Sequence, residues 1–153
     1  MNKTVRASFA ELYPFLREAI DGGHSFTFTA FGNSMHPYLR GGSDRVTLSP
    51  VRTPLKAGDV VFYRREQGGF VLHRIVRAEK GTLSLCGDNQ YVIERGVSED
   101  QVIAVLTERE RGGRKKSPAC ASARIWVFFL PLRRFFLHAG SFFMRRIKKL
   151  FSR

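Results

Sequence analysis

Hydrophobic and polar positions follow two different periods along the first two thirds of the chain. Over Ser8–Ile20 the apolar residues return every three or four positions, which is the period of an amphipathic helix. Glu11 follows Ser8 at the spacing of a capping box, and the glycines at 22–23 mark a helix end. Pro14 lies inside the pattern, so we expect the helix to kink there or to begin late.

The rest of this region has the period of two that is typical of β-strands. Residues 25–31 (SFTFTAF) alternate strictly, and further runs rich in β-branched and aromatic residues lie between Gly, Pro and Asp. The expected strands are 25–31, 45–48, 60–63, 70–76, 82–86 and 102–106. Several short strands after one helix predict a mainly β fold, as an all-β sandwich or a partly open barrel.

The net charge of +13 is distributed unevenly along the 153 residues. Residues 1–108 hold 13 Lys and Arg against 12 Asp and Glu (13 − 12 = +1), whereas residues 109–153 hold 13 against one (13 − 1 = +12). Half of the 14 phenylalanines also lie after residue 108. This division predicts a nearly neutral domain over 1–108, a solvated basic linker over 109–120 and a basic, aromatic tail over 121–153.

Candidate chemistry is found where the expected strands end. Ser34 follows the first strand directly, and Gly32 two positions earlier lets a substrate carbonyl come close to backbone N–H groups that stabilise an oxyanion. A serine hydroxyl needs a general base to act as a nucleophile, and His73 lies within the strand 70–76. Asp88 stands in a Gly-Asp-Asn turn after the next strand. Singly, each of these features is also found in ordinary turns and strands.

In their order and spacing, these segments resemble the successive motifs of the signal peptidase I family. The resemblance covers roughly residues 25–107. The matching segments are Gly32-x-Ser34-Met35-x-Pro37, Leu55-x-x-Gly58-Asp59-Val60-Val61, His73-Arg74-Ile75 and Gly87-Asp88-Asn89. In the bacterial housekeeping enzymes and the LexA-like repressors, a lysine base follows the serine by about 40 residues. Here His73 follows Ser34 by 39 (73 − 34), which resembles the endoplasmic-reticulum-type branch.

The resemblance implies a serine endopeptidase with the β-fold of signal peptidases and LexA-like repressors, and no cofactor. Ser34 would be the nucleophile and its N–H an oxyanion donor, with His73 as the general base. Gly32, Asn33 and Met35 would contact the substrate or the oxyanion, although Met35 also suits simple core packing. The substrate would be an extended peptide or precursor protein, bound by β-strand addition.

Two residues are candidates for the acid that would complete the triad. Asp88 is preferred because it stands in the Gly-Asp-Asn turn that the family places beside the site, but it also suits a role in holding that turn. Glu94 matches by position the family's acid, which lies a few residues beyond this turn. An unperturbed imidazole titrates near ~6.5, so we expect the acidic limb of the rate profile there.

The tail has the pattern of an interfacial membrane helix. No apolar run in it reaches the ~20 residues that span a bilayer. Over 124–151, Trp126 and many phenylalanines accompany basic residues off the apolar stripe, so we expect binding to anionic membrane surfaces. The alternative is a helix packed on its own domain. No specific nucleic acid is expected as a partner, because no readout motif accompanies the basic residues.

The N-terminal segment and the two cysteines indicate where the protein is found in the cell. Charged residues interrupt every early window, so we expect no export signal and no N-terminal membrane anchor, and a cytoplasmic protein associated peripherally with membrane. Cys86 and Cys120 fit no metal or disulfide spacing and are expected to be idle thiols. An alternative function also stays open, in which the chain is a catalytically inactive binding module that keeps the peptidase fold and docks through its tail.

Overall fold

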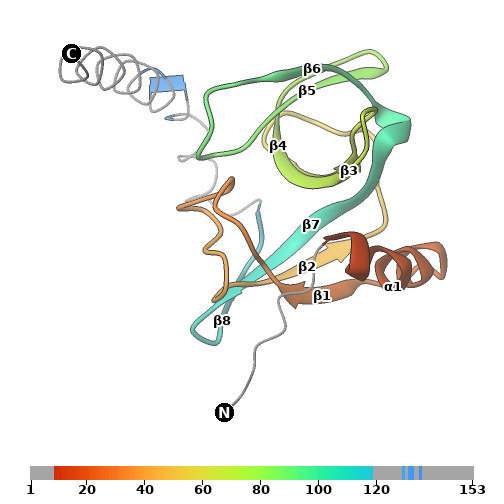
Figure 1. Cartoon of the computed structure of the whole chain (residues 1–153), viewed down its shortest axis with the longest axis vertical. Coiled ribbons are helices and arrows are strands. Elements are labelled where there is room, and N and C mark those ends of the chain that lie inside the picture. Colours follow the sequence, from red (N-terminus) through yellow and green to blue (C-terminus); the bar gives the residue numbers. More distant parts are fainter. Residues whose placement is uncertain (1–8, 119–128, 130, 133–134, 136–153) are drawn as a thin grey trace, which may run out of the picture.

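The computed structural model describes residues 9–118, 129, 131–132 and 135. Within these residues, one helix is followed by an antiparallel sheet (Figure 1). The elements are α1 (Phe9–Asp21), β1 (Phe26–Thr29), β2 (Arg45–Ser49), β3 (Val60–Arg64), β4 (Phe70–Glu79), β5 (Thr82–Cys86), β6 (Glu94–Ser98), the 3₁₀ turn η1 (Glu99–Gln101), β7 (Val102–Arg111) and β8 (Arg114–Lys116). The predicted mainly β class with an N-terminal helix is therefore confirmed, and all six expected strands are present.

The strands form one sheet in the order β1-β2-β7-β3-β4-β5-β6, with β8 paired to β7. Two long strands change partners along their length. β7 pairs with β3 through its first half and with β2 through its second, and β4 pairs first with β3 and then with β5. Because a strand that passes between two pairings must bend and twist, the sheet curls on itself (Figure 1).

The curled sheet encloses two hydrophobic cores, and β3 contributes to both. Val60 and Phe62 enter the core that also contains α1 and β1, whereas Val61 and Tyr63 enter the second core, inside the curl of β3–β6. Successive side chains of a strand point to opposite faces, so a strand buried on both faces is hydrophobic throughout. This explains the uninterrupted apolar run of β3.

Helix α1 closes the first core with its apolar face. Leu16 and Ile20 are buried, Phe9 lies 4.1 Å from Phe31 between ring centroids, and Tyr13 stacks on Phe70 at 4.2 Å. The helix includes Pro14 within its length and does not start there. It therefore begins close to where the periodicity predicted.

The linker predicted over 109–120 is wrong for residues 109–116. These residues form the end of β7 and the hairpin to β8. The charged side chains have partners across the sheet, since Glu110 lies 3.8 Å from Arg45 and Lys115 lies 3.0 Å from Glu108. A strand that exposes one face accommodates such alternating charges, which composition alone had assigned to a solvated linker.

The tail predicted over 121–153 lies outside the described residues, apart from positions 129, 131, 132 and 135. In the part of the chain that the structure describes, no helix has the length and apolar character needed to cross a membrane.

Candidate active site

Ser34 lies in the loop that joins β1 to β2, two residues beyond a glycine with a left-handed backbone. Gly32 has φ of +75°, a conformation that L residues with a Cβ rarely adopt. The chain turns sharply there, and Ser34 is left half-buried. Its N–H makes no hydrogen bond to another described residue, which suits an oxyanion donor.

The loop that carries Ser34 is fastened at its base by the β7 residues that were expected to form a linker. The carboxylate of Asp44 is fully buried and accepts hydrogen bonds from Arg111 Nε at 2.8 Å and from Arg111 Nη2 at 2.6 Å. Arg109 Nη1 donates to the Tyr38 carbonyl at 2.8 Å, and the Ala30 N–H donates to the Asp44 carbonyl at 2.8 Å. The hairpin arginines therefore hold the serine loop against the sheet.

A second contact fixes Ser34 against the turn after β5. The Asn89 N–H donates to the Ser34 carbonyl at 2.7 Å, and a Cβ on Gly87 would meet that same oxygen at 2.6 Å. Only glycine allows this close approach. Asp88 in the same turn accepts from Arg74 at 2.9 and 2.8 Å, and both side chains are fully buried. The turn thus links the serine loop to β4.

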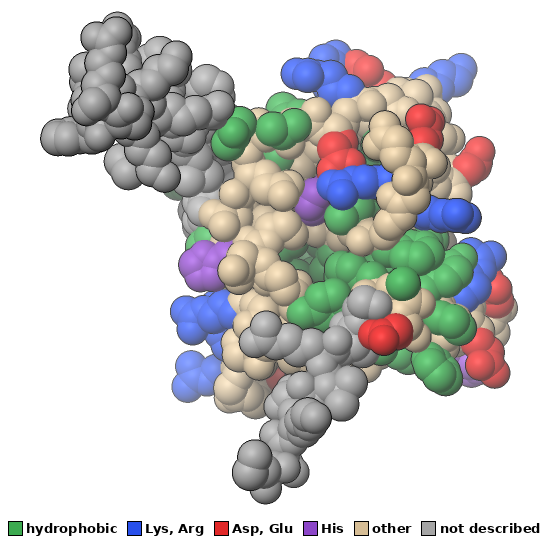
Figure 2. Space-filling view, viewed as in Figure 1, with side chains coloured by type: hydrophobic (Ala, Val, Ile, Leu, Met, Phe, Trp, Pro, Cys, Tyr) green, Lys and Arg blue, Asp and Glu red, His purple; other side chains and the backbone are tan. Residues whose placement is uncertain are grey.

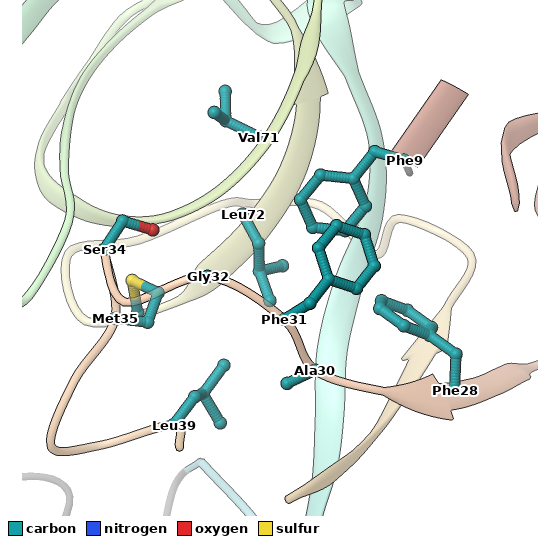
Figure 3. A pocket seen from close by; sticks show the side chains of 10 residues that line it. All are labelled: Phe9, Phe28, Ala30, Phe31, Gly32, Ser34, Met35, Leu39, Val71 and Leu72. Atoms are coloured by element: carbon teal, nitrogen blue, oxygen red, sulfur yellow. The ribbon is translucent and has the colours of Figure 1, made fainter. Parts of the chain in front are cut away.

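A small apolar pocket opens beside Ser34 (Figure 3). Its volume is about 40 Å³, with Ser34 at one end and the rings of Phe9, Phe28 and Phe31 at the other. It is lined by Phe9, Phe28, Ala30, Phe31, Gly32, Ser34, Met35, Leu39, Val71 and Leu72. Met35 is only 4% exposed and belongs to the first core, so it both packs the core and lines the pocket. Figure 2 shows hydrophobic side chains gathered on this face where α1 and β1 lie.

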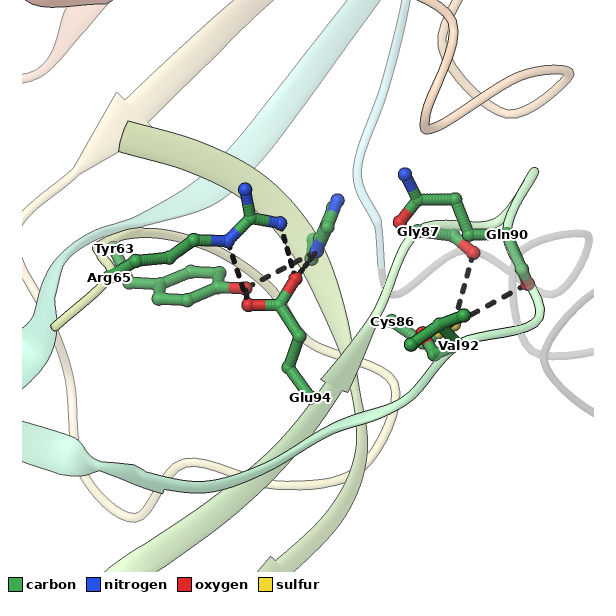
Figure 4. A network of polar contacts seen from close by, with 8 residues as sticks. Tyr63, Arg65, Cys86, Gly87, Gln90, Val92 and Glu94 are labelled. Carbon is green, nitrogen blue, oxygen red and sulfur yellow. Dashed lines mark hydrogen bonds and ion pairs between the residues drawn. The ribbon is translucent and has the colours of Figure 1, made fainter. Parts of the chain in front are cut away.

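His73 is completely buried and lies against a polar network centred on Glu94. Figure 4 shows Tyr63 and Arg65 directed at the Glu94 carboxylate. Its Nδ1 is 3.3 Å from Glu94 Oε1 and 3.3 Å from the Tyr63 hydroxyl. That hydroxyl donates to Glu94 Oε2 at 2.8 Å. Arg65 donates to both carboxylate oxygens, at 2.8 Å from Nε and 2.5 Å from Nη2. Oxygen acceptors at Nδ1 favour the tautomer with its proton on Nδ1.

That tautomer leaves the lone pair of the imidazole on Nε2, the nitrogen directed away from Glu94. Within the described part of the chain, His73 Nε2 is buried and has no hydrogen-bond partner. No hydrogen bond joins it to Ser34, although Ser34 lines the pocket together with Val71 and Leu72, the two residues before His73. In unliganded enzymes such hydrogen bonds often form only in the complex with substrate.

Burial changes the acid–base behaviour of this network. Desolvation lowers the pKa of His73 to about 4, although the neighbouring Glu94 carboxylate acts to raise it. Hydrogen bonds from Arg65 lower the pKa of Glu94, so its carboxylate stays ionised. The imidazole is therefore neutral, the form of a base, down to mildly acidic pH. Burial therefore places the titration of this imidazole below the ~6.5 of an unperturbed one, the value from which the acidic limb was expected.

The structure places the residues that the sequence singled out in three groups, at the Ser34 pocket, beside His73 and in the turn after β5. Ser34 lines the pocket with Gly32 and Met35, whereas Asn33 is exposed on the turn. For the acid, the structure places Glu94 beside His73 and places Asp88 in a buried ion pair with Arg74. The preference for Asp88 over Glu94 is not supported by this geometry.

Sequence reasoning missed Tyr63 and Arg65. In the sequence, Tyr63 is one more apolar residue of β3, and Arg65 is a charged residue at the end of a strand. Neither pattern indicates a functional role. Cys86 is buried, with its Sγ 3.1 to 3.4 Å from carbonyl oxygens of the loop between β5 and β6. Cys120 lies outside the described residues.

Among the described residues, no group of three or more His, Cys, Asp and Glu side chains is arranged to hold a metal ion. No family model matches the chain, and no curated protein matches it. The assignment of a function therefore rests on the geometry of the site and on the resemblance of its motifs.

Proposed function

We propose that this protein is a serine endopeptidase of the signal peptidase type, with the β-fold that these enzymes share with the LexA-like repressors. The main support for the proposal is the surroundings of the two ring nitrogens of His73. One of its nitrogens faces an ionised carboxylate, and the other is buried without a hydrogen-bond partner among the described residues. A neutral imidazole oriented in this way is what a serine nucleophile requires.

In this mechanism, Ser34 Oγ attacks the carbonyl carbon of the scissile peptide while His73 Nε2 takes the hydroxyl proton. The Ser34 N–H stabilises the oxyanion that forms. His73 then gives the proton to the leaving amine, and the C–N bond breaks to leave an acyl-enzyme. A water molecule, deprotonated by His73, hydrolyses the ester and restores the serine. Glu94 stabilises the imidazolium in both steps.

An extended substrate has a place beside the first half of β4. Residues Phe70–His73 pair with β3 on one side, and β5 begins to pair with β4 only at Arg74. Among the described strands, none pairs with the other side of this half. An open strand edge next to the Ser34 pocket supports binding of a peptide by β-strand addition.

The pocket beside Ser34 supports a preference for small side chains. The pocket is apolar and small, with a volume of about 40 Å³. Larger residues would have to displace the phenylalanine rings at its far end. Substrates with a small apolar residue next to the scissile bond are therefore expected.

The first prediction concerns the acid. Glu94→Gln should lower kcat by roughly 10²- to 10⁴-fold, because the neutral amide no longer stabilises the imidazolium. The measurement is turnover of a mixed peptide library, followed by mass spectrometry. Glu66→Gln is the matched control, since Glu66 is exposed and shares a surface hollow with Glu94. Wild-type turnover in Glu94→Gln would exclude Glu94 as the acid.

The second prediction concerns the tail, proposed to bind anionic membrane surfaces. Arg133, Arg134, Arg145 and Arg146 each contribute about 1 kcal/mol of attraction near such a surface. Changing all four to Gln should weaken partitioning to anionic vesicles by roughly 10²- to 10³-fold at low salt. Co-sedimentation with anionic and neutral vesicles measures this, with a 1–118 truncation as the tail-free reference.

Equal sedimentation of the full chain and the truncation would show that the tail is not the anchor. The truncation ends at 118 because the sheet continues to Lys116. Binding that resists high salt and alkaline carbonate would mean insertion, and the interfacial interpretation would fall.

A further inference from the structure

Arg65 holds the Glu94 carboxylate from its solvent side. Its side chain is 38% exposed, that of Glu94 is 25% exposed, and that of His73 is 1% exposed, so the three form a chain from solvent to interior. The two Arg65 donors occupy both carboxylate oxygens, and Tyr63 adds a third donor at Oε2. A bidentate guanidinium fixes the plane of a carboxylate as well as its position.

We propose that Arg65 is a positioning residue for the base: it orients Glu94 so that Oε1 faces His73 Nδ1, and it offsets the charge that Glu94 exerts on the imidazole. This inference rests on the proposed function. A glutamate side chain has three rotatable bonds, and only a fixed carboxylate keeps one tautomer and one ring orientation for His73. Tyr63 supports the same arrangement from β3.

Three charged side chains from outside β4 act on the His73 imidazole. Glu94 from β6 and Asp88 from the turn after β5 favour the imidazolium, whereas Arg65, just beyond β3, disfavours it. Tyr63 is neutral, because burial and its bond to Glu94 raise the pKa of its hydroxyl. Removal of Arg65 should therefore raise the pKa of His73, and removal of the Glu94 charge should lower it. These opposite directions distinguish the loss of the Arg65 charge from the loss of the Glu94 charge.

Loss of Arg65 should leave the fold intact. Its guanidinium is partly open to solvent, and it borders two surface hollows of about 190 and 330 Å³ that also reach Glu94. Water in these hollows would solvate the carboxylate that Arg65 leaves behind. The site thus tolerates the substitutions needed for a test.

The test compares Arg65→Met, Arg65→Lys and Glu94→Gln with the wild-type full chain. Two quantities are measured: the titration of the His73 imidazole by NMR, and kcat and KM over pH with a cleavable library peptide. We expect Arg65→Met to lower kcat by roughly 10- to 100-fold with little change in KM, because a misplaced carboxylate misaligns the base. It should also move the His73 titration and the acidic limb to higher pH, whereas Glu94→Gln moves the titration to lower pH.

Arg65→Lys keeps the charge and loses the bidentate geometry, so its titration should stay near that of wild type while kcat recovers in part. Arg95→Met is the matched control, since Arg95 is exposed and borders the same hollow as Arg65. A kcat in Arg65→Met that falls no further than in Arg95→Met, or that Arg65→Lys does not recover in part, would overturn the inference. No hydrolysis by wild type at any pH would instead overturn the proposed function, and with it the catalytic part of the inference, whatever the titration shows.

Discussion

Ser34→Ala is expected to lower the rate of peptide hydrolysis by roughly 10⁴-fold or more, since the hydroxyl is the attacking group. The residual rate should not exceed the ~10³- to 10⁴-fold over water that binding and an oxyanion hole provide alone. The fold should be unaffected, because the change removes one oxygen from a half-buried side chain in a loop. Turnover of the peptide library and thermal unfolding measure the two effects.

Ser43→Ala provides the control for this variant. Ser43 lies in the same loop, is exposed, and bonds only weakly to the Arg40 carbonyl at 3.4 Å. Its substitution should leave both turnover and stability near wild type. A Ser34→Ala protein that turns over substrate as fast as Ser43→Ala would remove Ser34 from the mechanism.

A large loss of stability is expected when the buried ion pair between Asp88 and Arg74 is broken. Asp88→Asn should lower the free energy of unfolding by about 3–5 kcal/mol, because it leaves the Arg74 charge buried without its carboxylate. Arg74 Nη1 also donates to the Gly58 carbonyl at 2.8 Å, and the guanidinium carbon lies 4.5 Å from the centroid of the Tyr38 ring. The side chain therefore has little freedom to reach solvent. Urea unfolding followed by circular dichroism measures the loss.

Asp21→Asn is the matched control, since Asp21 pairs with Arg17 on the surface, where both side chains are about half exposed. Such a pair contributes about 0.2–1 kcal/mol. A double change, Arg74→Met with Asp88→Leu, should recover much of the loss because it removes both buried charges. If Asp88→Asn costs no more than Asp21→Asn, the buried pair does not hold the turn against Ser34.

Much of the fold follows from local periodicity, and the exceptions have physical reasons. The helix and six strands bury apolar residues at the period of their secondary structure, so their positions were predictable. β6 was missed because only Val97 of its five residues is buried and because a glycine and two charges interrupt it. The hairpin to β8 was missed because cross-strand ion pairs, such as Lys115 with Glu108, depend on pairing that composition does not reveal.

The candidate site was predictable only in part. Ser34 and His73 stand out because each lies at a characteristic place within an ordered set of motifs. The choice between Asp88 and Glu94 depends on which carboxylate faces Nδ1 of His73, and the sequence does not show that contact. Asp88 instead forms an ion pair with Arg74, a contact between the turn after β5 and β4 that the spacing of 14 residues does not reveal. The lowered pKa of His73 likewise depends on burial.

Covalent trapping tests the central claim most directly, because it also separates a peptidase from an inactive binding module with the same fold. The full chain, Ser34→Ala and His73→Ala are treated with a serine-directed acylating probe that carries a small apolar side chain, and the modified residue is located by peptide mass spectrometry. The proposed mechanism predicts one acyl adduct on Ser34 in the wild type, none in Ser34→Ala and strongly slowed labelling in His73→Ala. Equal labelling of all three proteins, or no adduct on Ser34 in the wild type, would contradict it.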